Sequence, residues 1–500
     1  MATSHSEEPR RPELGAQTTD SLPPQASVPA REPAPSFPRT LRSSAPPSSP
    51  EPRWRVILCF LLTLAAIQLV LGPKLRLSQW QIASESNAAL AEGEAWLQGR
   101  LDIPLPHTPD LLHNRLHDTA YYNGKVYNVF PPLMTILTVL LSPLHHLIEA
   151  PEGYWLPWPY TLLAFWPLPI IGFIVFRRQV HSAAWAGLLT LAWMGGTAVL
   201  PNLHFAQTGL LGQVDHVVSQ TGLLIFTADL LGRRRIWPAL IGLAIATWTR
   251  QLTLLYGLPL LWLAWSQGRR RFVTGIVGLA IIAAPLLTLN WLKFGNPLEF
   301  GYRYIYAGRD TDDLAQRCLK YGVFSPHFVG ENAYYMFAAP PYIAVSPTQI
   351  QITGDNQYGT SLWITTPLAL FVFISAAAWW RDKTRRILML GTLPVLFGLL
   401  CYHNPGFLES GYSRFALDFL PIWLLVVAPW TRNGWRTWLT LLCTAWSLLY
   451  FQAVVPDGPV VESKPAPKIR TTRPAASMPV SHGPQDQSMK NATGSSHGQV

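Results

Sequence analysis

The 500-residue sequence has few charged residues and few cysteines. Only 13% of the residues are charged and 49% are hydrophobic, which places the chain in a membrane. No short-period repeat and no inverted half-repeat is visible. The four cysteines are scattered and have neither a disulfide framework nor the spacing of a zinc site: Cys59, Cys318, Cys401 and Cys443.

Long apolar runs recur along most of the chain, and a run of about 20 residues can cross a bilayer. The sequence therefore predicts an all-α, polytopic membrane bundle of about 11–12 transmembrane helices. The sequence leaves open whether segment 129–148 crosses the membrane fully or only enters it, because the segment starts at a double proline and ends at a double histidine. The other expected crossings are 54–73, 155–176, 182–200, 213–231, 272–291, 361–380, 386–402, 414–430 and 436–453, with a tight hairpin of two shorter runs at 236–249 and 251–266.

The distribution of Lys and Arg predicts the orientation. Five short loops together carry 14 Lys/Arg and one acid, whereas the long loops 74–128 and 292–360 each carry 5 Lys/Arg and 6 Asp/Glu. Cytoplasmic short loops collect Lys and Arg, so both long loops are expected outside. The net charge of +10 then follows from topology and does not indicate a nucleic-acid partner. The short loops are 177–178, 233–235, 269–271, 381–386 and 432–436.

The two ends of the chain are polar and rich in proline. Residues 1–53 are expected to form a disordered cytoplasmic tail, and residues 454–500 a second disordered tail outside. The transmembrane domain between them is expected at 54–453. Because about fifty polar residues precede it, the first span is expected to be an anchor rather than a cleavable signal peptide.

A charged, aromatic stretch lies just outside the first span and runs from Asp118 to Leu133 through the turn dipeptide Asn123-Gly124. Ionisable groups at membrane depth are costly and suggest function by default. Upstream, segment 80–98 has apolar residues at helical spacing, which predicts a helix along the membrane surface. The acids and cations of this loop are therefore expected at the mouth of the bundle.

Over residues 54–453 the layout resembles the GT-C class of integral-membrane glycosyltransferases, in particular bacterial relatives of protein O-mannosyltransferases and of the lipid A aminoarabinose transferase. The shared pattern is a first span, an outer loop with an acid on an amphipathic helix, a Gly-Lys-x-Tyr-x-x-x-Pro-Pro stretch at 124–132, and many further spans. Stretches 294–302 and 411–421 are similar to recurring stretches in uncharacterised members.

The resemblance implies a bacterial inner-membrane enzyme that moves a sugar from a polyprenyl-phosphate donor to an acceptor hydroxyl at the outer face. Its partners would be membrane lipid and the lipid-linked sugar, and no protein cofactor is implied. Such an enzyme needs a carboxylate to accept the hydroxyl proton and cationic groups for the departing phosphate. Sequence alone predicts no metal site and leaves a metal requirement open, because Asp310, Asp312 and Asp313 form too short a pattern to be specific.

Three acids are candidates for the catalytic carboxylates. The acid of the family's first loop maps to Glu85, although many members have an Asp-Glu pair where this chain has Ser84-Glu85. Asp118 is the competing base, and its structural alternative is to cap the turn that follows. The second acid of the aminoarabinose transferase pattern maps to Asp215, where it would help hold the first loop.

The candidate groups for the donor phosphate lie in the same outer region. A lone Arg250 among apolar residues needs an anion or a carbonyl as partner, and a lipid phosphate fits. Arg414 is four residues before Asp418, so those two form either an internal ion pair or part of the site. The remaining candidates, each with a structural alternative such as snorkelling or a buried pair, are Lys125, Tyr127 and His216.

Two other functions stay open. A transporter or flippase for a lipid-linked or polar substrate would use a similar bundle, although transporters are typified by repeats and by helices broken near the midplane. A family member without catalysis could serve as a scaffold. The concentration of polar groups at one face and in two large outer loops favours an enzyme.

Overall fold

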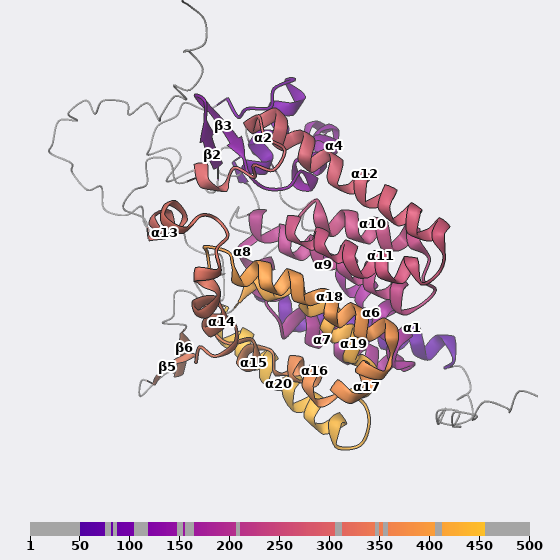
Figure 1. Cartoon of the computed structure of the whole chain (residues 1–500). Coiled ribbons are helices and arrows are strands. Elements are labelled where there is room, and N and C mark those ends of the chain that lie inside the picture. The colour runs from indigo at the N-terminus through magenta and orange to yellow at the C-terminus, as the bar shows by residue number, and fades with distance from the viewer. Residues whose placement is uncertain are drawn as a thin grey trace, which may run out of the picture. The chain divides into compact units, whose positions relative to one another are not determined.

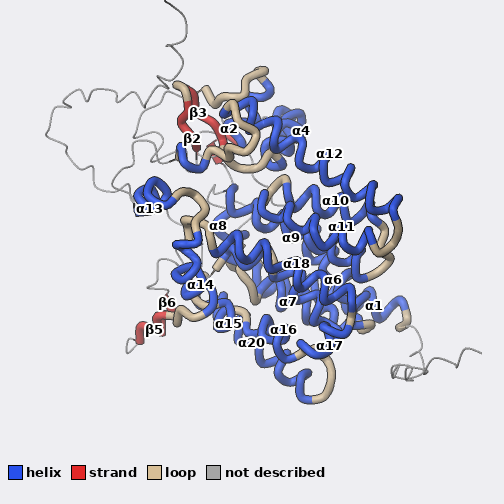
Figure 2. The backbone as a smooth tube through the Cα atoms, in the orientation of Figure 1, coloured by secondary structure: helices blue, strands red, loops and turns tan. Residues whose placement is uncertain are grey.

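The computed structural model is mostly helical, and its described residues include two small antiparallel hairpins and one further antiparallel strand pair (Figures 1 and 2). The chain divides into residues 1–50 and 51–500, and every described residue belongs to the second unit. The expected tails therefore lie almost wholly outside the described residues. Those residues are 51–75, 82–83, 88–104, 119–147, 154–155, 165–206, 211–305, 313–345, 350–353, 359–405 and 413–455.

The α-helices follow one another along the described chain, and short 3₁₀ segments connect several of them. The helices are α1 (Arg53–Leu71), α2 (Ala88–Leu97), α4 (Leu133–Leu147), α6 (Pro167–Val180), α7 (Ala183–Gly195), α8 (Val199–Ala206), α9 (Leu211–Leu231), α10 (Ile236–Thr247), α11 (Gly257–Trp265), α12 (Arg269–Phe294), α13 (Asp313–Tyr321), α14 (Val329–Phe337), α15 (Leu362–Thr365), α16 (Phe371–Ile374), α17 (Ala376–Arg381), α18 (Lys383–Leu400), α19 (Leu420–Val427) and α20 (Trp435–Val454). The 3₁₀ segments are η2 (Gln251–Tyr256), η3 (Tyr302–Tyr304), η4 (Pro326–Phe328), η5 (Pro367–Leu370), η6 (Arg414–Asp418) and η7 (Ala428–Trp430).

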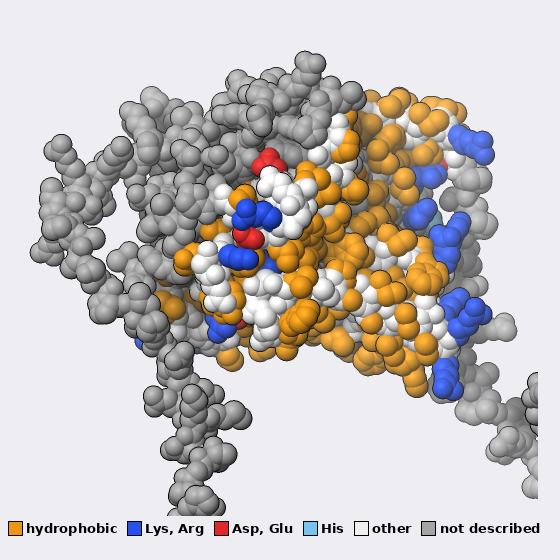
Figure 3. Space-filling view, turned by 90° about the horizontal axis from the view of Figure 1, so that it is seen from above, with side chains coloured by type: hydrophobic (Ala, Val, Ile, Leu, Met, Phe, Trp, Pro, Cys, Tyr) orange, Lys and Arg blue, Asp and Glu red, His pale blue; other side chains and the backbone are white. Residues whose placement is uncertain are grey.

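Among the residues that the structure describes, three helices are long and apolar enough to cross a membrane: α1, α12 and α20. Their outward side chains are large and apolar, and Leu69 and Leu449 are 79% and 68% exposed. Figure 3 shows such side chains spread over much of the visible surface. An exposed apolar surface of this kind suits hydrocarbon rather than water, so the chain is compatible with a membrane protein.

Several of the other expected crossings are interrupted. Segment 361–380 is divided among α15, η5, α16 and α17, because a residue before proline avoids the helical conformation and Thr366 precedes Pro367. Segment 182–200 is divided between α7 and α8 near Gly195 and Gly196. Counting apolar residues did not reveal these breaks, and the full set of crossings stays a prediction.

The hairpins lie mainly in the two long loops. Strands β2 (Thr119–Tyr122) and β3 (Lys125–Asn128) pair antiparallel, with Thr119 opposite Asn128. Their turn residues Asn123 and Gly124 both have positive φ, 49° and 77°, as a type I′ hairpin turn requires. The expected turn at this dipeptide is therefore confirmed. The other pairs are β1 (Ile82–Ala83) with β4 (Tyr154–Trp155), and β5 (Tyr342–Val345) with β6 (Ile350–Thr353).

Helix α2 differs from the surface helix expected at 80–98. It begins only at Ala88 among the described residues, and most of its side chains are buried against α4. A Cβ at Gly93 would overlap the Thr138 side chain, so the two helices approach closely. The small residues of α2 therefore pack against α4, whereas the sequence predicted a helix along the membrane surface.

The short basic loops lie together. Figure 1 shows the α11–α12 and α17–α18 connections at the same end of the helices, with the β2–β3 hairpin and α13 at the opposite end. Residues from 178–181, 231–235 and 385 line one cavity at the basic end. The connections there are tight because the first turns are capped by side chains: Ser182 caps α7 and Asp382 caps α18.

Candidate functional site

The centre of the polar cluster is a buried ion pair between Arg250 and Asp418. The Arg250 Nη2 and Nε atoms donate to the Asp418 carboxylate at 3.0 and 3.2 Å. The Asp418 side chain is fully buried and the Arg250 side chain is 17% exposed. A buried charge without a partner costs several kcal/mol, so each residue requires the other. Arg250 thus has the anionic partner that the sequence predicted, but that partner is a carboxylate of the chain itself.

Two 3₁₀ segments bring this pair together. Arg250 directly precedes η2, and Asp418 ends η6. The Tyr256 hydroxyl of η2 donates to the Asp418 backbone carbonyl at 2.8 Å, which joins the two segments. Gln220 of α9 donates to the Leu417 carbonyl. The chain leaves the α-helical conformation here, and buried side chains satisfy the carbonyls of Leu417 and Asp418, as buried backbone groups require.

Helix α9 brings Asp215 and His216 to the same cluster. Both residues are buried, at 3% and 1% exposure. His216 Nδ1 lies 3.6 Å from Asp418 Oδ1, and Arg250 attracts the Asp215 carboxylate electrostatically. Asp215 Oδ1 has no hydrogen-bond partner among the described residues. The structure thus brings together three candidates from two parts of the sequence: Asp215 and His216 of α9, and Arg250.

Arg414 and Arg250 lie against the same aromatic ring. The guanidinium carbons of Arg250 and Arg414 are each 5.3 Å from the centroid of the Phe415 ring. His216 stacks on the same ring with a centroid separation of 5.8 Å. Cations are attracted to the face of an aromatic ring, so Phe415 stabilises both guanidinium groups.

Arg250 and Arg414 both line a cavity of about 300 Å³. Among the described lining residues none is acidic, and the polar ones besides the two arginines are Gln251, Tyr302, Tyr402 and Asn404. The rest of the lining is aromatic or aliphatic, including Phe130, Phe300 and Phe324. A pocket with two cations, neutral hydrogen-bonding groups and apolar walls suits an amphipathic anion.

Lys125 and Tyr127 lie in a different environment. Lys125 is half exposed in the β2–β3 hairpin, with Nζ 3.8 Å from Asp102. A hydrogen bond from Arg100, helped by the charges of Arg100 and Lys125, holds the pKa of Asp102 below its usual value. Tyr127 is buried against Phe294 at a ring separation of 5.6 Å, and this burial raises its pKa. Neither Lys125 nor Tyr127 is among the residues that line the arginine cavity.

A second buried ion pair joins the first long loop to α12. Glu92 of α2 is fully buried, and its Oε1 lies 2.5 Å from Lys293 Nζ. Its other oxygen accepts from Asn128 at 2.8 Å and from Thr135 at 2.6 Å, and Lys293 also donates to the Asn128 carbonyl at 2.9 Å. This network links α2, β3, α4 and α12, so it fixes the hairpin to these helices.

Sequence reasoning noted some of these groups but did not assign the key pairings. Glu92 was one of six acids in the first loop, and nothing in the sequence distinguished it from Glu94. Asp418 was paired in sequence with Arg414, whereas the structure pairs it with Arg250, 168 residues away. Glu85 and Asp118 lie outside the described residues, so their expected convergence with Asp215 stays a prediction. Among the residues that the structure describes, no group of three His, Cys, Asp or Glu could hold a metal ion.

Comparison with known proteins gives no relative: no family model, no curated protein and no solved structure matches this chain.

Proposed function

We propose that this chain is a membrane glycosyltransferase of the GT-C type that takes a sugar from a polyprenyl-phosphate donor. The observation that carries the proposal is the pair of guanidinium groups on Phe415, at the wall of a cavity without described acids. One of these cations, Arg250, is balanced by Asp418. Arg414 adds a second guanidinium group at this wall, and guanidinium groups bind phosphate oxygens in a planar, bidentate manner, so the wall suits a phosphate.

The remainder of the cavity suits the rest of the donor. Leu252, Leu254 and Leu255 provide an apolar wall for the first isoprene units of a lipid. Tyr302, Tyr402 and Asn404 provide hydrogen-bonding groups of the kind that a sugar needs. This combination distinguishes a lipid-linked sugar from a soluble nucleotide sugar, which has no use for an aliphatic wall.

The proposed reaction needs a single base. The acceptor hydroxyl attacks the anomeric carbon, the bond from that carbon to the phosphate oxygen breaks, and polyprenyl phosphate leaves with the bonding electrons. Asp118 or Glu85 accepts the hydroxyl proton, and Asp215 helps position the first loop. Attack opposite the leaving group inverts the anomeric centre, so no covalent glycosyl-enzyme is required. The cationic wall stabilises the negative charge that develops on the leaving phosphate.

A transporter or flippase for a lipid-linked substrate is the second candidate. Its support is the pair of helix interruptions at η2 and η6, which lie beside the buried ion pair. Interrupted helices of this kind line the binding sites of many transporters. The two functions differ in the fate of the substrate, because a transferase cleaves the sugar–phosphate bond and a flippase leaves it intact.

A binding measurement tests the phosphate site. Purified full-length protein in lipid nanodiscs is titrated with polyprenyl phosphate, and binding is followed by native mass spectrometry. Arg414→Gln is expected to weaken binding about tenfold to a hundredfold, the equivalent of one hydrogen-bonded charge. Arg432→Gln removes the same charge from an exposed position in a short basic loop and is expected to bind normally. Equal affinities of wild type and Arg414→Gln, both folded, would remove the basis of the proposal.

A further inference from the structure

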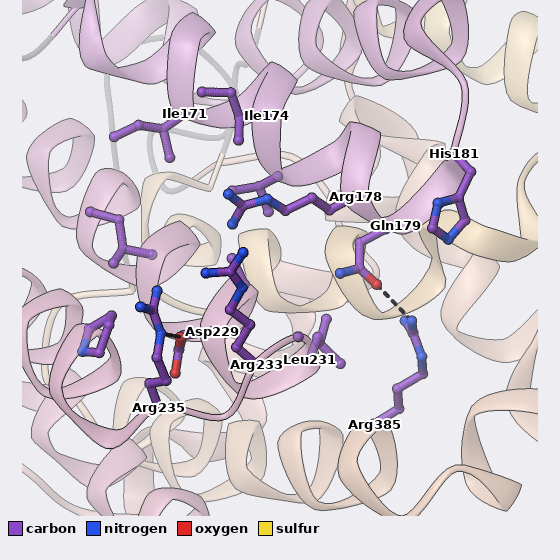
Figure 4. Close-up of a pocket in the computed structure, with 15 residues that line it drawn as sticks. Ile171, Ile174, Arg178, Gln179, His181, Asp229, Leu231, Arg233, Arg235 and Arg385 are labelled. Carbon is purple, nitrogen blue, oxygen red and sulfur yellow. Dashed lines mark hydrogen bonds and ion pairs between the residues drawn. The ribbon is translucent and has the colours of Figure 1, made fainter. Parts of the chain in front are cut away.

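A second cavity, of about 470 Å³, lies among the short basic loops (Figure 4). It is lined by residues from the end of α6, the end of α9, the loop after α9 and the start of α18. It shares no described lining residue with the Arg250–Arg414 cavity. Four arginines line it: Arg178, Arg233, Arg235 and Arg385.

The four arginines outnumber the acidic residues among the described residues that line this cavity. Asp229 is the acid among the described lining residues, and it lies 3.8 Å from Arg235. Arg385 is engaged elsewhere, since it donates to Gln179 at 2.7 Å and to the Val426 carbonyl at 2.5 Å. Arg178 and Arg233 attract the Asp229 carboxylate electrostatically, but neither side chain donates a hydrogen bond to a residue that the structure describes. The cavity therefore has two arginine side chains with unused donors and an excess of positive charge.

Figure 4 shows the guanidinium groups of Arg178, Arg233 and Arg235 extending toward a common space, while Arg385 reaches Gln179 at the far side. The wall above that space is apolar and includes Ile171 and Ile174, the second of which is 44% exposed. A ligand that fills this cavity would therefore contact cations at one end and aliphatic side chains at the other.

We infer that this cavity binds the phosphate headgroup of an anionic phospholipid, with an acyl chain against the isoleucine wall of α6. Two features favour a lipid over free phosphate. The apolar wall would contribute nothing to a small anion, and it continues onto an exposed apolar helix face. The loops that form the cavity are also the Lys/Arg-rich set, and basic residues beside a membrane attract anionic lipid. The inference does not depend on the transferase proposal, because it concerns the opposite end of the helices.

The experiment compares lipids and matched variants. Delipidated full-length protein in detergent is titrated with phosphatidylglycerol, with phosphatidylcholine of the same acyl chains, and with inorganic phosphate, and occupancy is measured by native mass spectrometry. The double variant Arg178→Gln/Arg233→Gln removes the two arginines with unused donors. The control double variant Arg269→Gln/Arg270→Gln removes the same charge from exposed positions at the start of α12, outside the cavity.

Phosphatidylglycerol is expected to bind more tightly than either other probe, and the cavity variant is expected to lose on the order of tenfold or more of that affinity. The control variant is expected to bind as the wild type does. Melting temperatures without lipid establish that both variants are folded, and Arg178→Lys/Arg233→Lys is expected to restore part of the binding. Equal losses in the two glutamine variants would overturn the inference, as would equal affinity for the two lipids or binding of inorganic phosphate as tight as that of phosphatidylglycerol.

Discussion

Arg250 donates to both oxygens of the Asp418 carboxylate, although 168 residues separate the two in the chain. The pair connects the start of η2 to the end of η6, two places where the apolar segments are not α-helical. It also fixes Arg250 at the wall of the cavity, with its guanidinium over Phe415. The ion pair therefore has two consequences, one for stability and one for the electrostatics of the site.

Breaking this pair on one side is expected to destabilise the fold. Asp418→Asn leaves the buried Arg250 charge without its counter-ion, and Arg250→Gln does the same to Asp418, so each is expected to cost about 3–5 kcal/mol. The double variant Arg250→Gln/Asp418→Asn is expected to cost less than the sum of the two, because no charge is then left unpaired. Unfolding by SDS titration in mixed micelles measures the three differences. Additive losses would mean that the two side chains do not interact.

The Glu92–Lys293 pair is expected to behave in the same way at the first long loop. Glu92→Gln and Lys293→Met each leave a buried charge, and each is expected to lower stability by about 3–5 kcal/mol. The matched control is Arg303→Gln, which removes an ion pair with Glu299 at 2.8 Å where the arginine is 59% exposed. An exposed pair of this kind contributes about 0–1 kcal/mol. Similar losses for Lys293→Met and Arg303→Gln would contradict the buried network.

Cysteine labelling tests the orientation predicted from Lys and Arg. In a background without the four native cysteines, Gln98→Cys and Asn296→Cys place exposed thiols in the two long loops, and Arg234→Cys places one in a short basic loop. A membrane-impermeant maleimide is expected to label the first two in intact cells and the third only after lysis. Labelling of Arg234→Cys in intact cells would contradict the predicted orientation. Protection of either long-loop position would mean that this loop does not lie outside.

Mutation of the two candidate bases, Asp118 and Glu85, is expected to reduce turnover to different degrees. General-base assistance contributes about 10²–10⁴-fold, so either Asp118→Asn or Glu85→Gln is expected to lose that much turnover with donor binding intact. The other is expected to lose much less, since one base suffices for an inverting transfer. Asp215→Asn is the third member of the series and is expected to act through positioning, with a smaller loss in turnover. Nearly full activity in both Asp118→Asn and Glu85→Gln would assign the base to another residue.

The sequence predicted local features well and long-range pairings poorly. The Asn123-Gly124 turn was predictable because both residues tolerate positive φ, and the apolar runs of α1, α12 and α20 were predictable from composition. The pairing of Arg250 with Asp418 was not, because only the fold brings η2 and η6 together. Arg414 was the nearer partner in sequence, but helical spacing is a poor guide where the segment is 3₁₀.

Burial was the second quantity that the sequence did not reveal. Glu92 resembled every other acid of the first loop, yet it is the one that α2, α4 and α12 enclose with Lys293. Helix α2 was expected on a surface, but its alanines and Gly93 pack it against α4. A stripe of small residues predicts a helix and leaves open whether lipid, water or another helix covers it.

Turnover of the donor tests the central claim most directly. Purified full-length protein is reconstituted into vesicles with a polyprenyl-phosphate-linked sugar and a lipid extract as the source of acceptors, and the donor is followed by mass spectrometry. The transferase proposal predicts release of free polyprenyl phosphate and transfer of the sugar with inversion, and loss of both in Arg414→Gln but not in Arg432→Gln. A donor that crosses the bilayer chemically intact, or stays unchanged with every acceptor fraction while still bound by the protein, would contradict the proposal.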